Sequence, residues 1–244
     1  MDKGNFKKKI IKSARNEEKP ADPAPLSEFS WRDIVTGSPG AAVLLMAGLL
    51  FLALLWACAT TPPKRFDNVC EIFREYPEWY DAAYDTYKRW GVPIYVTMAI
   101  MHQESKYIAD ARPPRTTCLW IFPGPRPSSA YGYAQAKDET WAEYQESTGN
   151  SWADRDDFED AIDFVGWYCY LSHKQCGISR KNARSLYLAY HEGRGGFNRG
   201  TYRSKKWLLR VADKVQRRSD LYRGQLAACE GELRDRGGCC LWPF

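Results

Sequence analysis

The sequence predicts a mostly α-helical globular domain that follows an apolar membrane segment near the N-terminus. Three observations support this fold class. Apolar residues recur at helical spacing through most of the chain after residue 66, Gly and Pro divide that part into discrete runs, and no segment alternates apolar and polar residues over a useful length. With 244 residues, 44% of them hydrophobic and 27% charged, the chain is large enough for one full domain.

The membrane prediction rests on residues 41–59. No charged residue occurs between Gly40 and Ala59, and about 20 apolar residues are needed to cross the ~30 Å hydrocarbon layer. Lys and Arg residues precede this run, so we expect a cytoplasmic N-terminus and an exported domain after residue 60. Residues 1–40 have the composition of a disordered, basic leader, and residues 60–66 form a short linker.

The apolar run ends in Leu55-Trp56-Ala57-Cys58, which resembles a bacterial lipobox and makes Cys58 a candidate for lipidation. Trp56 is larger than the usual residue at its position, and the leader is longer than that of an ordinary cleaved signal. A lipoprotein signal is favoured, with an uncleaved signal anchor as the alternative. In both cases we expect a membrane-anchored domain on the periplasmic side of a Gram-negative envelope.

Capping and breaking residues predict the first helices of the exported domain, residues 67–236. Asn68 is expected to cap a helix over Val69–Glu75. Pro77 at a first-turn position begins the next helix, which Gly91 ends, and a strongly apolar helix follows over residues 94–106.

The second half of the domain begins with an irregular, Pro-rich loop over residues 109–129, and loops of that length are often functional. A long amphipathic helix is expected from residue 204 to about residue 236. Its predicted apolar stripe consists of Leu208, Val211, Val215, Tyr222, Leu226, Cys229 and Leu233. The helices predicted between them are 138–147 with Asp138 as its cap, 156–175, and 179–190 with Ser179 as its cap.

The eight cysteines do not show zinc-ligand spacing with accompanying His, so we expect no metal site. Cys70 opens the domain and Cys229 lies near its end, and a disulfide between them would clamp the two ends together. Cys169 and Cys176 could pair only if the helix ended between them, because bridged Cα atoms lie within about 7 Å. The Cys-rich tail, residues 237–244, has no assigned role.

Composition narrows the class of partner. The net charge of +5 is too mild and too mixed in sign to indicate a nucleic-acid partner. The 10 Trp and 15 Tyr residues serve mostly as core, although flat aromatic faces with polar edges also suit sugar-binding clefts.

Glu104 carries the prediction of chemistry. It lies near the end of the apolar helix 94–106, one turn after Ile100 and Met101. Burial among apolar groups would raise the pKa of its carboxyl, which would then be able to protonate a glycosidic oxygen at neutral pH. Most glycosidases use two carboxylates, and nothing marks Asp110 or Asp138 as the second one. Taken alone, Glu104 would be an ordinary helix-end carboxylate.

Two downstream segments change that interpretation. Together with Glu104-Ser105, the segments Gly132-Tyr133-Ala134-Gln135 and Ala189-Tyr190-His191-Glu192-Gly193 resemble the three ordered motifs of soluble lytic transglycosylase (SLT) domains, in particular those of Gram-negative SLT-domain lipoproteins. The resemblance covers about residues 67–200 and implies a goose-type-lysozyme-like, mostly helical fold. It implies a peptidoglycan substrate, cleaved between N-acetylmuramic acid and N-acetylglucosamine with a 1,6-anhydro product, and no cofactor.

The resemblance also implies a role for each matched residue. Glu104 is expected to act as the single general acid and base. The expected substrate-binding residues are Ser105, Gly132, Tyr133, Gln135, Tyr190 and His191.

This chain departs from the usual pattern at two places. It has Gly-Tyr-Ala-Gln where Gly-Leu-Met-Gln is usual, and His191-Glu192 where Asn-Ala is usual. A structural role is favoured for His191 and Glu192 over a catalytic one, since His is as often a packing residue as a functional one.

Two alternatives stay open at this point. One is a hydrolytic muramidase, in which water replaces the attacking sugar hydroxyl. The other is a non-catalytic module that binds glycan or an envelope protein, against which the Glu104-Ser105 pair speaks.

Overall fold

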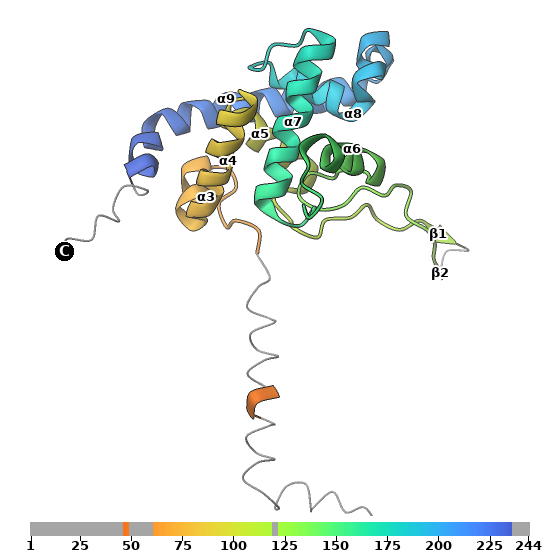
Figure 1. Ribbon diagram of the computed structural model, residues 1–244. Coiled ribbons are helices and arrows are strands. Elements are labelled where there is room, and N and C mark those ends of the chain that lie inside the picture. The colour runs from red at the N-terminus through yellow and green to blue at the C-terminus, as the bar shows by residue number, and fades with distance from the viewer. Residues whose placement is uncertain (1–45, 49–60, 119–121, 236–244) are drawn as a thin grey trace, which may run out of the picture. The chain divides into compact units, whose positions relative to one another are not determined.

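The computed structural model describes residues 46–48, 61–118 and 122–235 (Figure 1). The chain divides into two compact units, Met1–Ala59 and Thr60–Phe244. Residues 46–48 of the first unit are helical, whereas the leader 1–40, the rest of the apolar run with Cys58, and the tail 237–244 lie outside the described residues. Within the described ranges, no helix combines the length and the apolar character that a membrane crossing requires.

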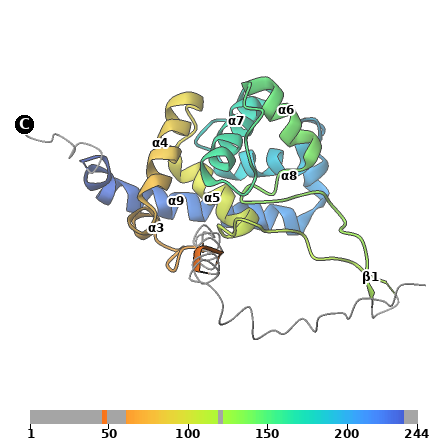
Figure 2. The ribbon, with the colours of Figure 1, turned by 60° about the horizontal axis from the view of Figure 1, so that its bottom comes forward.

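The second unit is built almost entirely of helices, as Figures 1 and 2 show, so the predicted mostly α class is confirmed. A short antiparallel pair, β1 (Thr117–Cys118) and β2 (Phe122–Pro123), lies inside the predicted irregular loop. The helical elements are α3 (Val69–Glu75), α4 (Pro77–Trp90), α5 (Ile94–Ser105), α6 (Asp138–Thr148), α7 (Phe158–Cys176), α8 (Ala183–Arg199), the 3-10 helix η1 (Thr201–Ser204) and α9 (Lys206–Asp235).

Helix α5 is the central element, in contact with α4, α7, α8 and α9. Six consecutive residues from Val96 to Met101 are buried, so this helix has no solvent face over nearly two turns. Its sequence explains that position, because apolar side chains point in every direction around the helix. As a result, the polar residue Glu104 lies near the end of a helix whose preceding residues form part of the core.

Several predicted helix ends are confirmed. The side-chain oxygen of Asn68 accepts hydrogen bonds from the backbone N–H groups of Cys70 and Glu71, at 3.0 and 3.4 Å, as a cap should. Gly91 ends α4 in the left-handed conformation with φ 68°, which glycine adopts without steric cost.

Two predicted caps are wrong. Asp138 is the first residue of α6 rather than its cap, and its carboxylate forms an ion pair with Arg155 at 2.7 Å. The cap of α8 is Asn182, whose side chain accepts from the N–H of Ser185 at 2.9 Å. Ser179 instead accepts from the N–H of Lys181 within the preceding turn.

The structure shows one disulfide and two free cysteines in the described part of the helical unit. Cys70 and Cys229 form a disulfide that joins α3 to α9 across 159 residues. Cys169 and Cys176 are both free. Helix α7 continues to Cys176, so the helix end that their pairing would have required is absent between them.

Candidate active site

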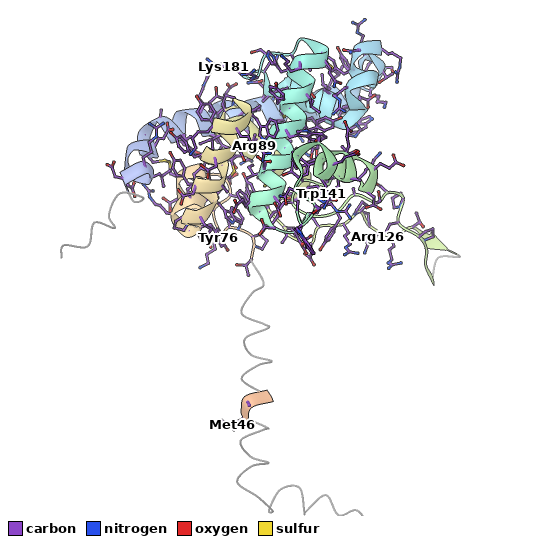
Figure 3. The ribbon with its side chains drawn as sticks, in the orientation of Figure 1. Met46, Tyr76, Arg89, Arg126, Trp141 and Lys181 are labelled. Atoms are coloured by element: carbon purple, nitrogen blue, oxygen red, sulfur yellow. A yellow bond between two sulfur atoms is a disulfide. The ribbon has the colours of Figure 1, made fainter. Side chains whose placement is uncertain are left out.

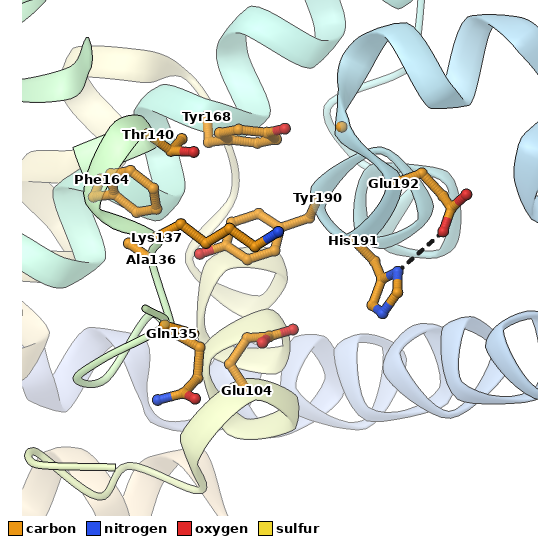
Figure 4. A pocket seen from close by; sticks show the side chains of 12 residues that line it. Glu104, Gln135, Ala136, Lys137, Thr140, Phe164, Tyr168, Tyr190, His191 and Glu192 are labelled. Carbon is orange, nitrogen blue, oxygen red and sulfur yellow. Dashed lines mark hydrogen bonds and ion pairs between the residues drawn. The ribbon is translucent and has the colours of Figure 1, made fainter. Parts of the chain in front are cut away.

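A cavity of about 390 Å³ lies beside the end of α5 (Figure 4). Four of the residues predicted for the site line it: Glu104, Gln135, Tyr190 and His191. They come from α5, from the segment before α6, and from α8, so the three sequence motifs meet at one place.

An aromatic wall forms one side of this cavity. Phe164 and Tyr168 of α7 line it together with Tyr190 of α8, and the rings of Tyr168 and Tyr190 meet edge to face at 5.0 Å. Trp141 of α6, labelled in Figure 3, supports the wall from behind with its ring 5.2 Å from that of Phe164. Aromatic side chains of this kind supply flat apolar faces that suit the faces of sugar rings.

The carboxyl group of Glu104 has a raised pKa. Burial disfavours its charged form and raises the pKa of its carboxyl from 4.5 to about 7, although a hydrogen bond from the Tyr187 hydroxyl opposes the rise. A substantial fraction of the carboxyl groups is therefore protonated at neutral pH, as a general acid requires.

Tyr187 was missed by the sequence analysis. It lies on α8 one turn before Tyr190, and both residues interact electrostatically with Glu104. Burial raises the pKa of both hydroxyls above 10, with a further contribution from the Glu104 charge, so both groups keep their protons and act as donors. The i, i+3 spacing of the two tyrosines on one helix face was the available signal.

Ser105 lies next to Glu104 but does not line the cavity. It is 5% exposed, and its Oγ donates to the carbonyl of Met101 at 3.4 Å and accepts from the N–H of Tyr107 at 3.1 Å. Lys106 and Tyr107 then turn the chain with positive φ angles of 55° and 63°. In this geometry Ser105 fixes the helix end that carries Glu104, rather than reaching a ligand.

In the second motif, Gln135 lines the cavity, whereas Gly132 and Tyr133 do not. Tyr133 is 1% exposed and packs edge to face against Trp79 and Phe158, so the structure places this side chain in the core and outside the cavity lining. Gly132 has a φ of 79°, and a Cβ there would lie 2.0 Å from the carbonyl oxygen of Arg155. The close approach that this glycine permits is therefore to the protein's own backbone.

Gln135 is held firmly at the cavity. Its Nε2 donates to the carbonyl oxygens of Ala111 and Gly132 at 2.8 and 2.9 Å, and its backbone has a φ of 49°. The two hydrogen bonds set the orientation of the amide, whose oxygen lies on the side of Glu104 (Figure 4). A positive φ at a residue other than glycine is uncommon, and such residues cluster at functional sites.

Tyr190 joins the second and third motifs. Its hydroxyl donates to the carbonyl of Ala134 at 2.6 Å, so the ring stands between α8 and the segment that carries Gln135. The sequence predicted that this helix ends at Tyr190. Instead, α8 continues to Arg199 through a kink at Gly193, where φ is 76° and ψ is 154°.

Glu192 is the second carboxylate that lines the cavity, and its environment is the opposite of that around Glu104. Burial alone would raise the pKa of Glu192, but hydrogen bonds from Lys205, Thr201 and His191 outweigh it and lower the pKa to about 2. Lys205 Nζ lies 2.7 and 3.0 Å from its two oxygens. The carboxylate is thus permanently ionised and its acceptor sites are occupied.

His191 occupies the cavity wall between these two groups (Figure 4). Its Nδ1 lies 3.1 Å from Glu192 Oε1, and its ring meets that of Trp207 edge to face at 5.2 Å. Across residues 46–48, 61–118 and 122–235, no group of three His, Cys, Asp or Glu side chains could hold a metal ion.

Comparison with known protein families identifies the family of this chain. The family model described as transglycosylase SLT domain matches residues 46–229 of this chain. No curated protein and no solved structure matches it. Since the matched segment is well over half of the 244 residues, the family inferred from the three motifs is confirmed: the chain belongs to the transglycosylase SLT domain family.

Proposed function

We propose that this protein is a peptidoglycan lytic transglycosylase that cleaves the bond between N-acetylmuramic acid and N-acetylglucosamine and leaves 1,6-anhydro ends. The observation that carries the proposal is Glu104, a carboxyl with a pKa of about 7 that opens into a cavity lined by Gln135, Tyr190 and an aromatic wall. Membership of the SLT family supports peptidoglycan glycan strands as the substrate.

In the proposed reaction Glu104 gives its proton to the glycosidic oxygen as the bond to C1 breaks. The Tyr187 hydroxyl stabilises the carboxylate that forms, because a hydrogen bond to the charged form favours it. The C6 hydroxyl of the muramic acid then bonds to C1 and returns its proton to Glu104. The substrate's N-acetyl group stabilises the intermediate, which removes the need for a carboxylate nucleophile.

The state of Glu192 favours this route over one with two carboxylates. A carboxylate nucleophile needs free lone pairs, and those of Glu192 are engaged by Lys205, Thr201 and His191. The side chain of Glu192 is also only 4% exposed. Within the cavity, Glu104 is therefore the carboxyl available to a substrate.

The decisive experiment is mass spectrometry of sacculi digested by the wild-type protein and by Glu104→Gln. Anhydro ends from the wild type and no products from the variant are expected. Reducing ends instead would indicate a hydrolytic muramidase. Equal binding of sacculi by both proteins, with no products from either, would establish the non-catalytic module and reject the proposal.

We also propose that the helical unit works on the periplasmic side, tethered through residues 41–59. The support is the sequence: an uncharged run with a basic segment before it, ending at Cys58. Mass spectrometry of the membrane-extracted protein distinguishes the two tethers. A lipid-bearing Cys58 at a new N-terminus indicates a lipoprotein, an intact leader indicates a signal anchor, and recovery in the cytosolic fraction would overturn the proposal.

A further inference from the structure

His191 is held by more contacts than an exposed surface histidine needs. Its Nδ1 is bonded to Glu192, its ring packs against Trp207 of α9, and the kink at Gly193 begins two residues later. Glu192 is in turn held by Lys205 and Thr201, which lie beyond that kink. The imidazole is thus held directly by Trp207 of α9 and indirectly, through Glu192, by Thr201 of η1.

The hydrogen-bond partner of Nδ1 determines whether Nε2, the other ring nitrogen, is a donor or an acceptor. An ionised carboxylate only accepts hydrogen bonds, so the 3.1 Å contact places the hydrogen on Nδ1. In the neutral ring Nε2 then carries a lone pair. No hydrogen-bond partner for Nε2 occurs among the described residues, and the side chain is 36% exposed where it lines the cavity.

We propose that Glu192 fixes His191 as a hydrogen-bond acceptor for a donor group of the glycan, a sugar hydroxyl or an acetamido N–H, bound in the cavity of Glu104. This inference rests on the proposed function. Glu192 is the positioning residue and His191 the binding residue. An Asn at position 191 could turn either its oxygen or its nitrogen toward the sugar, whereas the neutral histidine held by Glu192 offers only a lone pair.

The test compares His191→Leu, which removes the acceptor, with His191→Asn, which keeps an acceptor. KM and kcat are measured with soluble glycan strands at pH 8. At pH 8 the Leu variant should raise KM by about tenfold with little change in kcat, which is the size expected for one lost hydrogen bond. The Asn variant should keep KM near the wild-type value.

His173→Asn is the matched control, because the Nδ1 of His173 bonds to the carbonyl of Ile178 and the residue does not line the cavity. Glu192→Gln should raise KM at pH 8 in the wild-type background and have no further effect in His191→Leu.

The possible results separate this inference from the proposed function. If wild-type protein releases no glycan products, the proposed function fails. If it releases products but His191→Leu leaves KM unchanged at pH 8, or lowers kcat with KM unchanged, only the acceptor role is overturned. Thermal unfolding of each variant checks that the fold is retained, and the change in KM without a change in kcat, restored in His191→Asn, provides a readout that a purely structural role would not give.

Discussion

The raised pKa of Glu104 predicts an effect on stability that is independent of any substrate. Its carboxyl has a pKa of about 7 in the folded protein and 4.5 as a free side chain. At 1.36 kcal/mol per pH unit, that gap corresponds to about 3 kcal/mol. Glu104→Gln keeps the size of the side chain and removes the charge, so it should relieve this cost.

The change of this stability difference with pH follows from proton linkage. Below pH 4.5 the carboxyl is protonated in both the folded and the unfolded state, so the wild type and the variant should differ little. Between pH 4.5 and about 7 the folded state holds more protons than the unfolded state, and wild-type stability falls as the pH rises. Above pH 7 the full penalty applies, and Glu104→Gln should be more stable by about 3 kcal/mol.

Thermal unfolding followed by circular dichroism at pH 4, 5, 6, 7 and 8 measures this difference. For a domain of this size, about 3 kcal/mol corresponds to a Tm gain of roughly 6–12 °C at pH 8 and almost none at pH 4. The control is Glu146→Gln, an exposed glutamate on α6, for which the difference should stay small at every pH. Parallel curves for wild type and Glu104→Gln across this range would refute the raised pKa and with it the assignment of the general acid.

Three other predictions test the surroundings of the site. Tyr187→Phe removes the hydrogen bond that lowers the pKa of Glu104, so the alkaline limb of the pH–activity profile should move to higher pH, and an unchanged or lower limb would contradict this. Gly132→Ala should destabilise the protein by about 2–4 kcal/mol in denaturant titrations, since its Cβ would meet the Arg155 backbone at 2.0 Å, whereas Gly149→Ala has a similar positive φ and open space and should cost only about 1 kcal/mol. Cys70→Ser with Cys229→Ser opens a disulfide across 159 residues and should lower stability by about 2–5 kcal/mol under oxidising conditions, with no difference from wild type once the latter is reduced.

The sequence correctly predicted those elements that depend on residues close together in the chain. The Asn68 cap, the Gly91 stop and the buried course of α5 all follow from side chains near the position concerned. The predicted apolar stripe of α9 is also confirmed, because a single amphipathic helix packs its apolar side inward whatever it meets. Its members Leu208, Val215, Tyr222, Leu226, Cys229 and Leu233 are buried, and Val211 is half-buried.

The structure departs from the local patterns where distant residues compete with neighbouring ones. Asp138 had a suitable position for a cap, but the guanidinium of Arg155, 17 residues away, takes its carboxylate. Tyr133 belongs to a motif that reaches the cavity, yet α4 and α7 surround its ring with Trp79 and Phe158. Tyr187 could be assigned to Glu104 only once the rotation of α8 against α5 was known, which no local pattern contains.

The two glutamates of the cavity show how one small site assigns opposite roles to the same side chain. Glu104 lies near the end of the strongly apolar helix α5 and accepts a hydrogen bond from one neutral donor, so burial dominates and its pKa rises to about 7. Glu192 is buried as well, but a cation and two further donors compensate the desolvation and its pKa falls to about 2. Groups whose environments separate their pKa values in this way are candidates for acid and base roles. Here the ionised member is already hydrogen-bonded to Lys205, Thr201 and His191, so its oxygens are engaged by the protein and it is linked to the cavity by the ring of His191. The residues that replace the usual Asn-Ala of the third motif are therefore coupled to each other, and their combined effect should be sought in the binding of glycan rather than in the transfer of the proton.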